Sequence, residues 1–191
     1  MEWITLLAAG LTVLTVASTT PDTKIISFGE VAYGGSGCSA GEAQIKSLGT
    51  LTRIRTDDFV VKTGVDDPAV DRKSCNLSIP VQVPSGYQIA LPTIQVRGKV
   101  DLNDHSNARL DTEIFFAGQA GVKQSETFQG GLQKRFKLNF STNNNAWSAC
   151  GASVNIRVNL GLLVRSARGQ ADQGMITSIR LPTNLQVRAC H

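Results

Sequence analysis

Alternation of apolar and polar residues is the dominant pattern along the chain. It covers residues 93–103, 108–116 and 153–165, and shorter stretches cover 75–83 and 136–140. A strand places successive side chains on opposite faces, whereas a helix needs apolar residues three and four positions apart. These segments lack the helical spacing, so each is predicted to be a strand with one buried and one solvated face.

Turn-forming residues separate the predicted strands. Stretches rich in Gly, Pro, Asn and Asp lie at 33–37, 65–68, 84–86, 103–106, 129–131 and 143–145. Residues 166–174 are predicted to form an exposed loop before a last strand at 175–187. About ten such strands with no helical block between them are typical of a single all-β domain. We therefore expect an antiparallel β-sandwich, jelly-roll or immunoglobulin-like in character.

The N-terminal segment has the features of a secretory signal. Residues 4–17 are uncharged and largely apolar, and small residues at 16–18 precede a polar stretch. The apolar run is short for a bilayer span. We expect a signal peptide at 1–18 and a secreted domain at 19–191 that has no membrane attachment after cleavage. Glu2 stands where a signal usually carries a cation, so an uncleaved membrane anchor is the alternative.

If the chain is secreted, its four cysteines are expected to form disulfide bonds. They are Cys38, Cys75, Cys150 and Cys190. An even number of extracellular cysteines usually forms disulfides, and four cysteines allow three connectivities. We favour the sequential pairs, because they would staple each half of the chain. A zinc site would want a C-x-x-C spacing, which the sequence lacks.

The charge is mildly basic. The 191 residues include 19 Lys or Arg and 15 Asp or Glu, which gives a net charge of +4 and a pI near 9.0. The cations are scattered rather than clustered in a run, so nucleic-acid binding is not predicted. A solvated surface is the favoured interpretation, and attraction to an acidic polysaccharide or an anionic membrane is the alternative.

Several short blocks resemble a known family. They are ISFGEVAYGGSGC at 26–38, DFV at 58–60, RKSCNL at 72–77, PSGY at 84–87, VRG at 96–98 and CG at 150–151. In this order they resemble a family of small secreted proteins of fungi and bacteria known only as a domain of unknown function. Ser39 stands where we expect that family to have Pro, a difference that concerns the local turn. The resemblance implies secretion and a cysteine-stapled β domain, and it transfers no catalytic residue.

Catalytic signatures are sparse. The chain has two histidines, His105 and His191, and no G-x-S-x-G elbow, so a serine hydrolase is not predicted. A glycosidase needs only two facing carboxylates. Asp111 and Glu113 share the polar phase of one predicted strand and could project into a groove. The other acidic candidates are Asp57, Asp58, Asp66, Asp67, Asp71 and Glu126.

Metal and cofactor signals are weak. Asp66, Asp67 and Asp71 crowd one loop, and hard oxygen ligands in a loop suit calcium. Their spacing does not match an EF-hand, so solvated turn residues are the favoured interpretation. No cofactor is predicted.

Exposed aromatic residues are the best candidates for contact with a sugar. Tyr33, Tyr87 and Trp147 lie at or near predicted turns, and aromatic rings stack on sugar faces. The alternative for Trp147 is that it packs over a nearby disulfide. Asn76 and Asn139 begin N-glycosylation sequons on polar phases, which matter only in a eukaryotic source.

The sequence therefore predicts a non-catalytic extracellular or cell-surface module that binds glycan or cell wall. A secreted hydrolase that uses paired carboxylates is one alternative. An extracellular inhibitor or effector that binds another protein through its loops is the other. The sequence leaves the oligomeric state open.

Overall fold

The computed structural model describes residues 26–48, 51–142, 146–167, 169–182 and 185–190. Every regular element in these ranges is a β-strand. Within the same ranges, no helix is long and apolar enough to cross a membrane. The predicted signal peptide at 1–18 lies outside the described residues.

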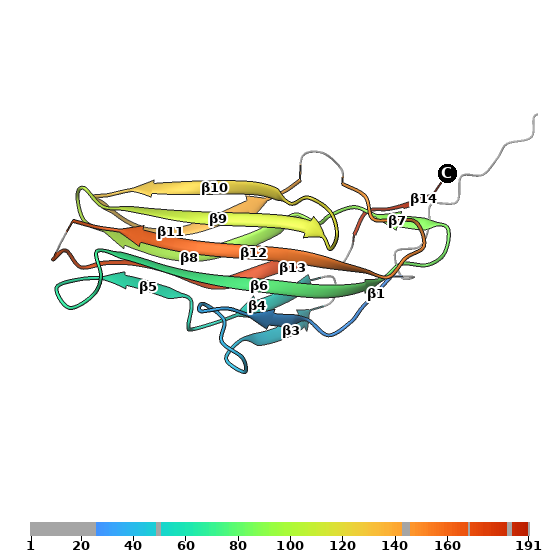
Figure 1. Cartoon of the computed structure of the whole chain (residues 1–191), viewed down its shortest axis with the longest axis horizontal. Coiled ribbons are helices and arrows are strands. Elements are labelled where there is room, and N and C mark those ends of the chain that lie inside the picture. The colour runs from blue at the N-terminus through green and yellow to red at the C-terminus, as the bar shows by residue number, and fades with distance from the viewer. Residues whose placement is uncertain (1–25, 49–50, 143–145, 168, 183–184, 191) are drawn as a thin grey trace, which may run out of the picture.

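The strands form two large antiparallel sheets and one small one (Figure 1). Sheet A contains β1 (Ser27–Phe28), β2 (Ala32–Gly34), β6 (Val70–Gln82), β9 (Asn107–Phe116), β10 (Val122–Gln129) and β12 (Val154–Arg165). Sheet B contains β3 (Gln44–Leu48), β4 (Leu51–Arg55), β5 (Val60–Thr63), β8 (Ile94–Leu102), β11 (Leu132–Phe140) and β13 (Asp172–Pro182). The small sheet pairs β7 (Tyr87–Ile89) with β14 (Val187–Ala189) at one end of the molecule.

The strand order places the longest strands at the centre of each sheet. Sheet A runs β1-β6-β12-β9-β10, with β2 also paired to β6. Sheet B runs β11-β8-β13-β4-β3, with β5 also paired to β13. The apolar phases face inward as predicted, and they bury Ile94, Val96, Val100, Ile156, Val158, Leu160 and Leu162 among others. The predicted antiparallel β-sandwich is confirmed.

The chain crosses repeatedly between the two large sheets, and the steps β8 to β9, β10 to β11 and β12 to β13 are three of these crossings. Two of these turns pack together. A Cβ at Gly130 would lie 2.2 Å from the carbonyl oxygen of Asn103, so this close approach requires glycine. His105 takes a left-handed conformation in the β8–β9 turn, with φ of 64°.

The last predicted strand needs correction. In place of one strand at 175–187, β13 begins at Asp172 and ends at Pro182, and β14 is a separate strand in the small sheet. Asp172 belongs to the strand because its buried side chain accepts hydrogen bonds from the β8–β9 turn, from Asn103 and Ser106. Pro182 has no backbone N–H with which to extend the ladder. The predicted loop at 166–174 is correspondingly shorter.

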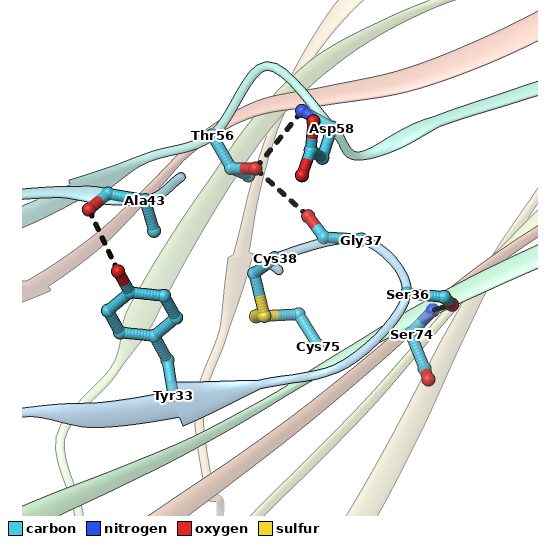
Figure 2. The surroundings of a disulfide bond; sticks show 9 residues. All are labelled: Tyr33, Ser36, Gly37, Cys38, Ala43, Thr56, Asp58, Ser74 and Cys75. Atoms are coloured by element: carbon cyan, nitrogen blue, oxygen red, sulfur yellow. Dashed lines mark hydrogen bonds between the residues drawn. A yellow bond between two sulfur atoms is a disulfide. The ribbon is translucent and has the colours of Figure 1, made fainter. Parts of the chain in front are cut away.

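Both disulfides join the predicted pairs. Cys38–Cys75 is fully buried and ties the segment after β2 to β6. Thr56, between β4 and β5, donates a hydrogen bond to the carbonyl of Gly37 at 3.0 Å, and Ser36 accepts one from the N–H of Ser74 (Figure 2). The buried bridge therefore sits where segments of both sheets meet.

The second bridge, Cys150–Cys190, lies at the end that carries the small sheet. Cys190 donates its N–H to the carbonyl of Gly86 at 2.8 Å, and Gly151 donates its own to Tyr87 at 2.9 Å. Cys150 is exposed. This bridge thus joins the C-terminal segment to the segment before β12, and the two hydrogen bonds hold both segments against Gly86 and Tyr87.

Candidate functional site

An open groove of about 560 Å³ crosses the outer face of sheet A. Its walls are solvent-facing side chains of four neighbouring strands, β6, β12, β9 and β10. Along the groove the outward residues of these strands are polar, whereas the inward residues of β6, β9 and β12 belong to the core. The same alternation that builds the sandwich therefore gives this groove polar walls.

Gly161 forms the floor of the groove. It lies on β12 and is paired with Ser74 of β6 and Asp111 of β9. It has no side chain to fill the space between those neighbours. The guanidinium of Arg72 borders this space, since a Cβ at Gly161 would lie 3.1 Å from Arg72 Nη2. The hollow is thus centred on a glycine, with a cation at one side.

Asp111 is held by two neighbours. Its Oδ2 accepts hydrogen bonds from Nε and Nη2 of Arg109 at 3.0 and 2.9 Å. Its Oδ1 accepts a hydrogen bond from Ser125 Oγ at 2.6 Å. Ser125 lies directly opposite Asp111 in the β9–β10 ladder, so the strand register sets this contact.

Glu113 is held in the same way by strands on both sides. Asn159 of β12 donates a hydrogen bond from Nδ2 to Glu113 Oε2 at 3.0 Å. Lys123 of β10 places Nζ 3.8 Å from Oε1. Both partners lie directly opposite Glu113 in their ladders. The carboxylate therefore links three strands across the groove wall.

The groove is nearly balanced in charge. Its two carboxylates face three cations, Arg72, Arg109 and Lys123, and the amides of Asn76 and Asn159 lie between them. Amides both donate and accept hydrogen bonds, and guanidinium groups donate in a fixed plane. No aromatic residue is among those that line the groove. Such a surface suits a neutral, hydroxyl-rich ligand bound by hydrogen bonds.

Two sequence-predicted features meet at this groove. Asp111 and Glu113, expected on one polar phase, both line it. Asn76, the first sequon residue, is exposed on β6 at the groove wall. Asn139, the second, is exposed on β11 of sheet B, where it accepts a hydrogen bond from Gln95 at 3.0 Å. A glycan on Asn76 would occupy the groove, whereas one on Asn139 would not.

The predicted aromatic contacts lie elsewhere. Trp147 and Tyr87 belong to the end with the small sheet, where Trp147 forms a bridge with Ala90. The guanidinium of Arg188 lies 4.0 Å from the centre of the Trp147 ring, so a cation covers one face of the ring. Their role as ligand contacts stays a prediction that the groove does not require.

Tyr33 is tied into the fold rather than presented to solvent. It lies on β2, packs against the core and donates a hydrogen bond from its hydroxyl to the carbonyl of Ala43 at 3.3 Å (Figure 2). The residue as a whole is half-buried, and its role as a ligand contact stays a prediction.

The acidic loop forms no evident cation site. Asp66 and Asp67 are exposed, and Asp71 accepts a hydrogen bond from the backbone N–H of Lys62 at 2.9 Å. Among the residues that the structure describes, no group of three or more His, Cys, Asp or Glu side chains is placed to hold a metal ion. A calcium site at this loop stays a prediction.

Residues 24–190 match a family described as a domain of unknown function (DUF4360). The chain belongs to this family. The DUF4360 match covers nearly the whole secreted part expected from the sequence, and it confirms the kind of family that the GGSGC, RKSCNL and PSGY blocks resemble.

A curated relative of this DUF4360 chain is an uncharacterized secreted protein of Arthroderma benhamiae. The two are 28% identical over 167 residues, an alignment that covers 78% of this chain and 65% of the relative. The chain thus spans about 65% of that relative's length.

Similar solved structures include carbohydrate-binding modules. One is TmCBM61 in complex with β-1,4-galactotriose, with a TM-score of 0.32, 12% identity and coverage of 81% of this chain and 92% of that one. Another is the CBM36-1 domain of a xylanase from the hindgut metagenome of Trinervitermes trinervoides, with a TM-score of 0.30, 15% identity and coverage of 78% and 96%. TM-scores of this size give no information about what the DUF4360 chain binds.

Proposed function

We propose that this protein is a secreted glycan-binding module and that the groove of sheet A holds a segment of neutral oligosaccharide. The observation that carries the proposal is the groove itself, which is open, polar and nearly balanced in charge. Sugar hydroxyls donate and accept hydrogen bonds, as do the groove's amides. Arg72 and Asn76 make no side-chain hydrogen bond to the described part of the chain, so both are available to a ligand.

The arrangement of the carboxylates favours binding over hydrolysis. A glycosidase needs one carboxyl group to protonate the leaving oxygen and a second to attack or to activate water. In this groove both oxygens of Asp111 already accept hydrogen bonds, and both oxygens of Glu113 face Asn159 or Lys123. The carboxylates thus fix the groove wall rather than face a reacting bond.

Because no aromatic residue lines the groove, we expect a weak affinity for a short oligosaccharide. Stacking on an aromatic ring adds contact energy that hydrogen bonds alone do not supply, because those bonds replace equally good bonds to water. We expect a dissociation constant on the order of 0.1–1 mM for a short oligosaccharide. Several adjacent repeats of an insoluble polymer would raise the apparent affinity.

The first test is depletion of the purified, oxidised mature protein by insoluble glycans. Chitin, cellulose, β-glucan, xylan, peptidoglycan and whole cell walls would each be mixed with the protein at low and at physiological ionic strength. We expect saturable retention on at least one matrix that persists at about 0.15 M salt, since a balanced groove does not depend on net charge. Retention on none of them would refute the proposal.

Variants locate the binding site on the retaining matrix. Asn159→Ala and Gly161→Val should each weaken retention about tenfold, the first by removing an amide and the second by filling the floor. Asn155→Ala is the matched control, because it lies on the same face of β12 outside the groove. Equal loss in the control would contradict the groove assignment. Trp147→Ala tests the sequence-predicted contact, and a loss confined to that variant would move the site to the small sheet.

The same incubations test hydrolysis. Release of soluble sugar that disappears in Glu113→Gln would replace binding with catalysis as the function of this groove. Because this variant keeps the size of the side chain, it should leave the three-strand contact largely in place.

A further inference from the structure

The outer face of sheet B gathers cations from all over the sequence. We call this surface the basic face, and it consists of Lys46, Arg53, Arg55, Arg97, Lys99, Arg135, Lys137 and Arg180. They come from five strands, and each lies on the solvent-facing phase of its strand. Of the side chains that these strands and β5 point outward, only Asp101 is acidic, and it accepts a hydrogen bond from Gln133.

The strand register places like charges directly opposite one another. Arg53 is paired with Lys46 on one side and with Arg180 on the other. Arg97 is likewise paired with Lys137, and Lys99 with Arg135. Like charges at directly opposed positions of a sheet destabilise the fold. The basic face is therefore a concentration of unfavourable pairs.

No ion pair in the described part of the chain neutralises these cations, although Arg97 donates a hydrogen bond from Nε to Gln95 Oε1 at 2.8 Å. The ion pairs found there are Arg109–Asp111 and Lys123–Glu113, and both lie on sheet A. The Nε atoms of Arg53 and Arg180 are buried without a hydrogen-bond partner. Burial, followed by the positive charges of Arg53 and Arg97, lowers the pKa of Arg180. Buried polar atoms normally have hydrogen-bond partners, so packing Arg53 beside Arg180 leaves two donors unsatisfied in addition to opposing two like charges.

We propose that the basic face binds an acidic polysaccharide, whose repeated carboxylates supply the missing negative charges. An oblique row with one cation per strand crosses the whole sheet, through Lys46, Arg53, Arg180, Arg97 and Lys137; Arg180 lies opposite Gln95, so the row shifts by two residues along β8 to reach Arg97. Neighbouring strands lie about 4.8 Å apart, so the row spans about 19 Å, enough for several sugars. Arginine forks match carboxylates in a bidentate geometry, which suits a regular chain of uronic acids.

Other polyanions fit this surface less well. Surfaces that bind membranes through their interface insert exposed apolar side chains. The exposed large apolar residues of the described chain are Val65 and Val70, and neither lies on the basic face. Single-stranded nucleic acids stack their bases on aromatic rings, and the outward residues of sheet B include none.

The experiment compares two forms of one polymer. Polygalacturonate carries a carboxylate on each sugar, whereas its methyl ester has the same backbone without the charge. Binding of soluble oligomers of each form to the mature protein would be measured by calorimetry at low and physiological ionic strength. We expect the acid to bind at least about tenfold more tightly than the ester, with an affinity that falls as salt rises. Equal binding of the two forms would overturn the proposal.

A pair of charge-matched variants separates a site from net charge. Arg53→Gln with Arg180→Gln removes two charges from the basic face. Arg157→Gln with Arg165→Gln removes two from the outer face of sheet A, outside the groove lining. The first pair should weaken polygalacturonate binding about tenfold and the second less than about threefold. Equal losses of polygalacturonate binding in the two double variants would show that only the net charge matters, and would refute the assignment of the site to the basic face.

Thermal stability gives an independent reading. If Arg53 and Arg180 serve a ligand, removing them relieves repulsion and should raise the Tm of the free protein by about 1–3 °C. A fall in Tm would show that they stabilise the fold and would contradict the proposal. Tighter binding to anionic lipid vesicles or to DNA than to polygalacturonate would contradict it as well. Asn159→Ala should leave this binding unchanged, so failure here and failure of the groove proposal are distinguishable.

Discussion

Gly98 shows how closely the core of sheet B is packed around a single residue. It faces inward on β8, opposite Phe136 of β11. A Cβ there would lie 2.1 Å from the carbonyl oxygen of Met175 and 2.4 Å from Phe136 Cζ. Gly98→Ala should therefore lower the free energy of unfolding by about 2–3 kcal/mol, because backbone and ring must move apart. Urea denaturation measures the loss.

Gly34 is the matched control for that substitution. It lies in β2, and a Cβ there would meet nothing within 4 Å. Gly34→Ala should change the stability by less than about 0.5 kcal/mol. Similar changes at the two glycines would show that the backbone freedom of glycine, and not the close approach to Phe136, determines the change in stability.

The position of a single residue was predictable where it follows from the alternation of inward and outward side chains along a strand. Cys75 falls on an apolar phase and is buried, and Asp111 and Glu113 fall on a polar phase and line the groove. The environment of Trp147 was not predictable, because Arg188 covers its ring from a separate strand. Phase places a side chain inside or outside a sheet, but it does not identify its neighbour across the ladder.

At the scale of elements, Asp172 fastens the β8–β9 turn to the start of β13. This buried carboxylate accepts hydrogen bonds from the backbone N–H and the side-chain amide of Asn103 and, at 2.7 Å, from Ser106 Oγ. Asp172→Asn replaces one acceptor oxygen by an NH₂ group, which would face the donors of Asn103 or Ser106. The substitution should therefore lower the free energy of unfolding, measured by urea denaturation, by about 2–3 kcal/mol. Asp101→Asn, at an exposed site on β8, should cost less than about 0.5 kcal/mol. Comparable losses in the two variants would mean that the turn does not depend on Asp172.

The cations illustrate what alternation predicts and what it leaves open. Arg53 and Arg55, Arg97 and Lys99, and Arg135 and Lys137 each stand two residues apart on a polar phase. This spacing was a usable signal for charged strand faces, although along the chain the pairs look scattered. Their gathering on one surface depends on the order β11-β8-β13-β4-β3, which long-range pairing sets. Local periodicity contains no information about that order.

At the scale of the whole molecule, the disulfides provide a comparison with nearly equal loops. The bridges close sequence separations of 37 and 40 residues, so chain entropy contributes about 4 kcal/mol to each. Cys38 and Cys75 are fully buried, whereas Cys150 is exposed. Replacing Cys38 and Cys75 by Ala should therefore cost about 1–2 kcal/mol more than replacing the other pair, because it also leaves a cavity. Equal losses in urea denaturation would show that loop closure alone accounts for both.

The groove and the basic face lie on opposite sides of the sandwich, and this placement makes a final prediction about the intact protein. Two packed sheets hold their outer faces more than about 10 Å apart, so a ligand on one face does not obstruct the other. The protein should then retain soluble polygalacturonate on whichever neutral matrix binds it, and the polymer should not be retained without the protein. Gly161→Val and the Arg53→Gln, Arg180→Gln pair should each reduce this retention about tenfold, although each variant keeps one of the two binding activities. If polygalacturonate instead released the protein from the neutral matrix, both polymers would compete for one surface, and the two faces would not be separate sites.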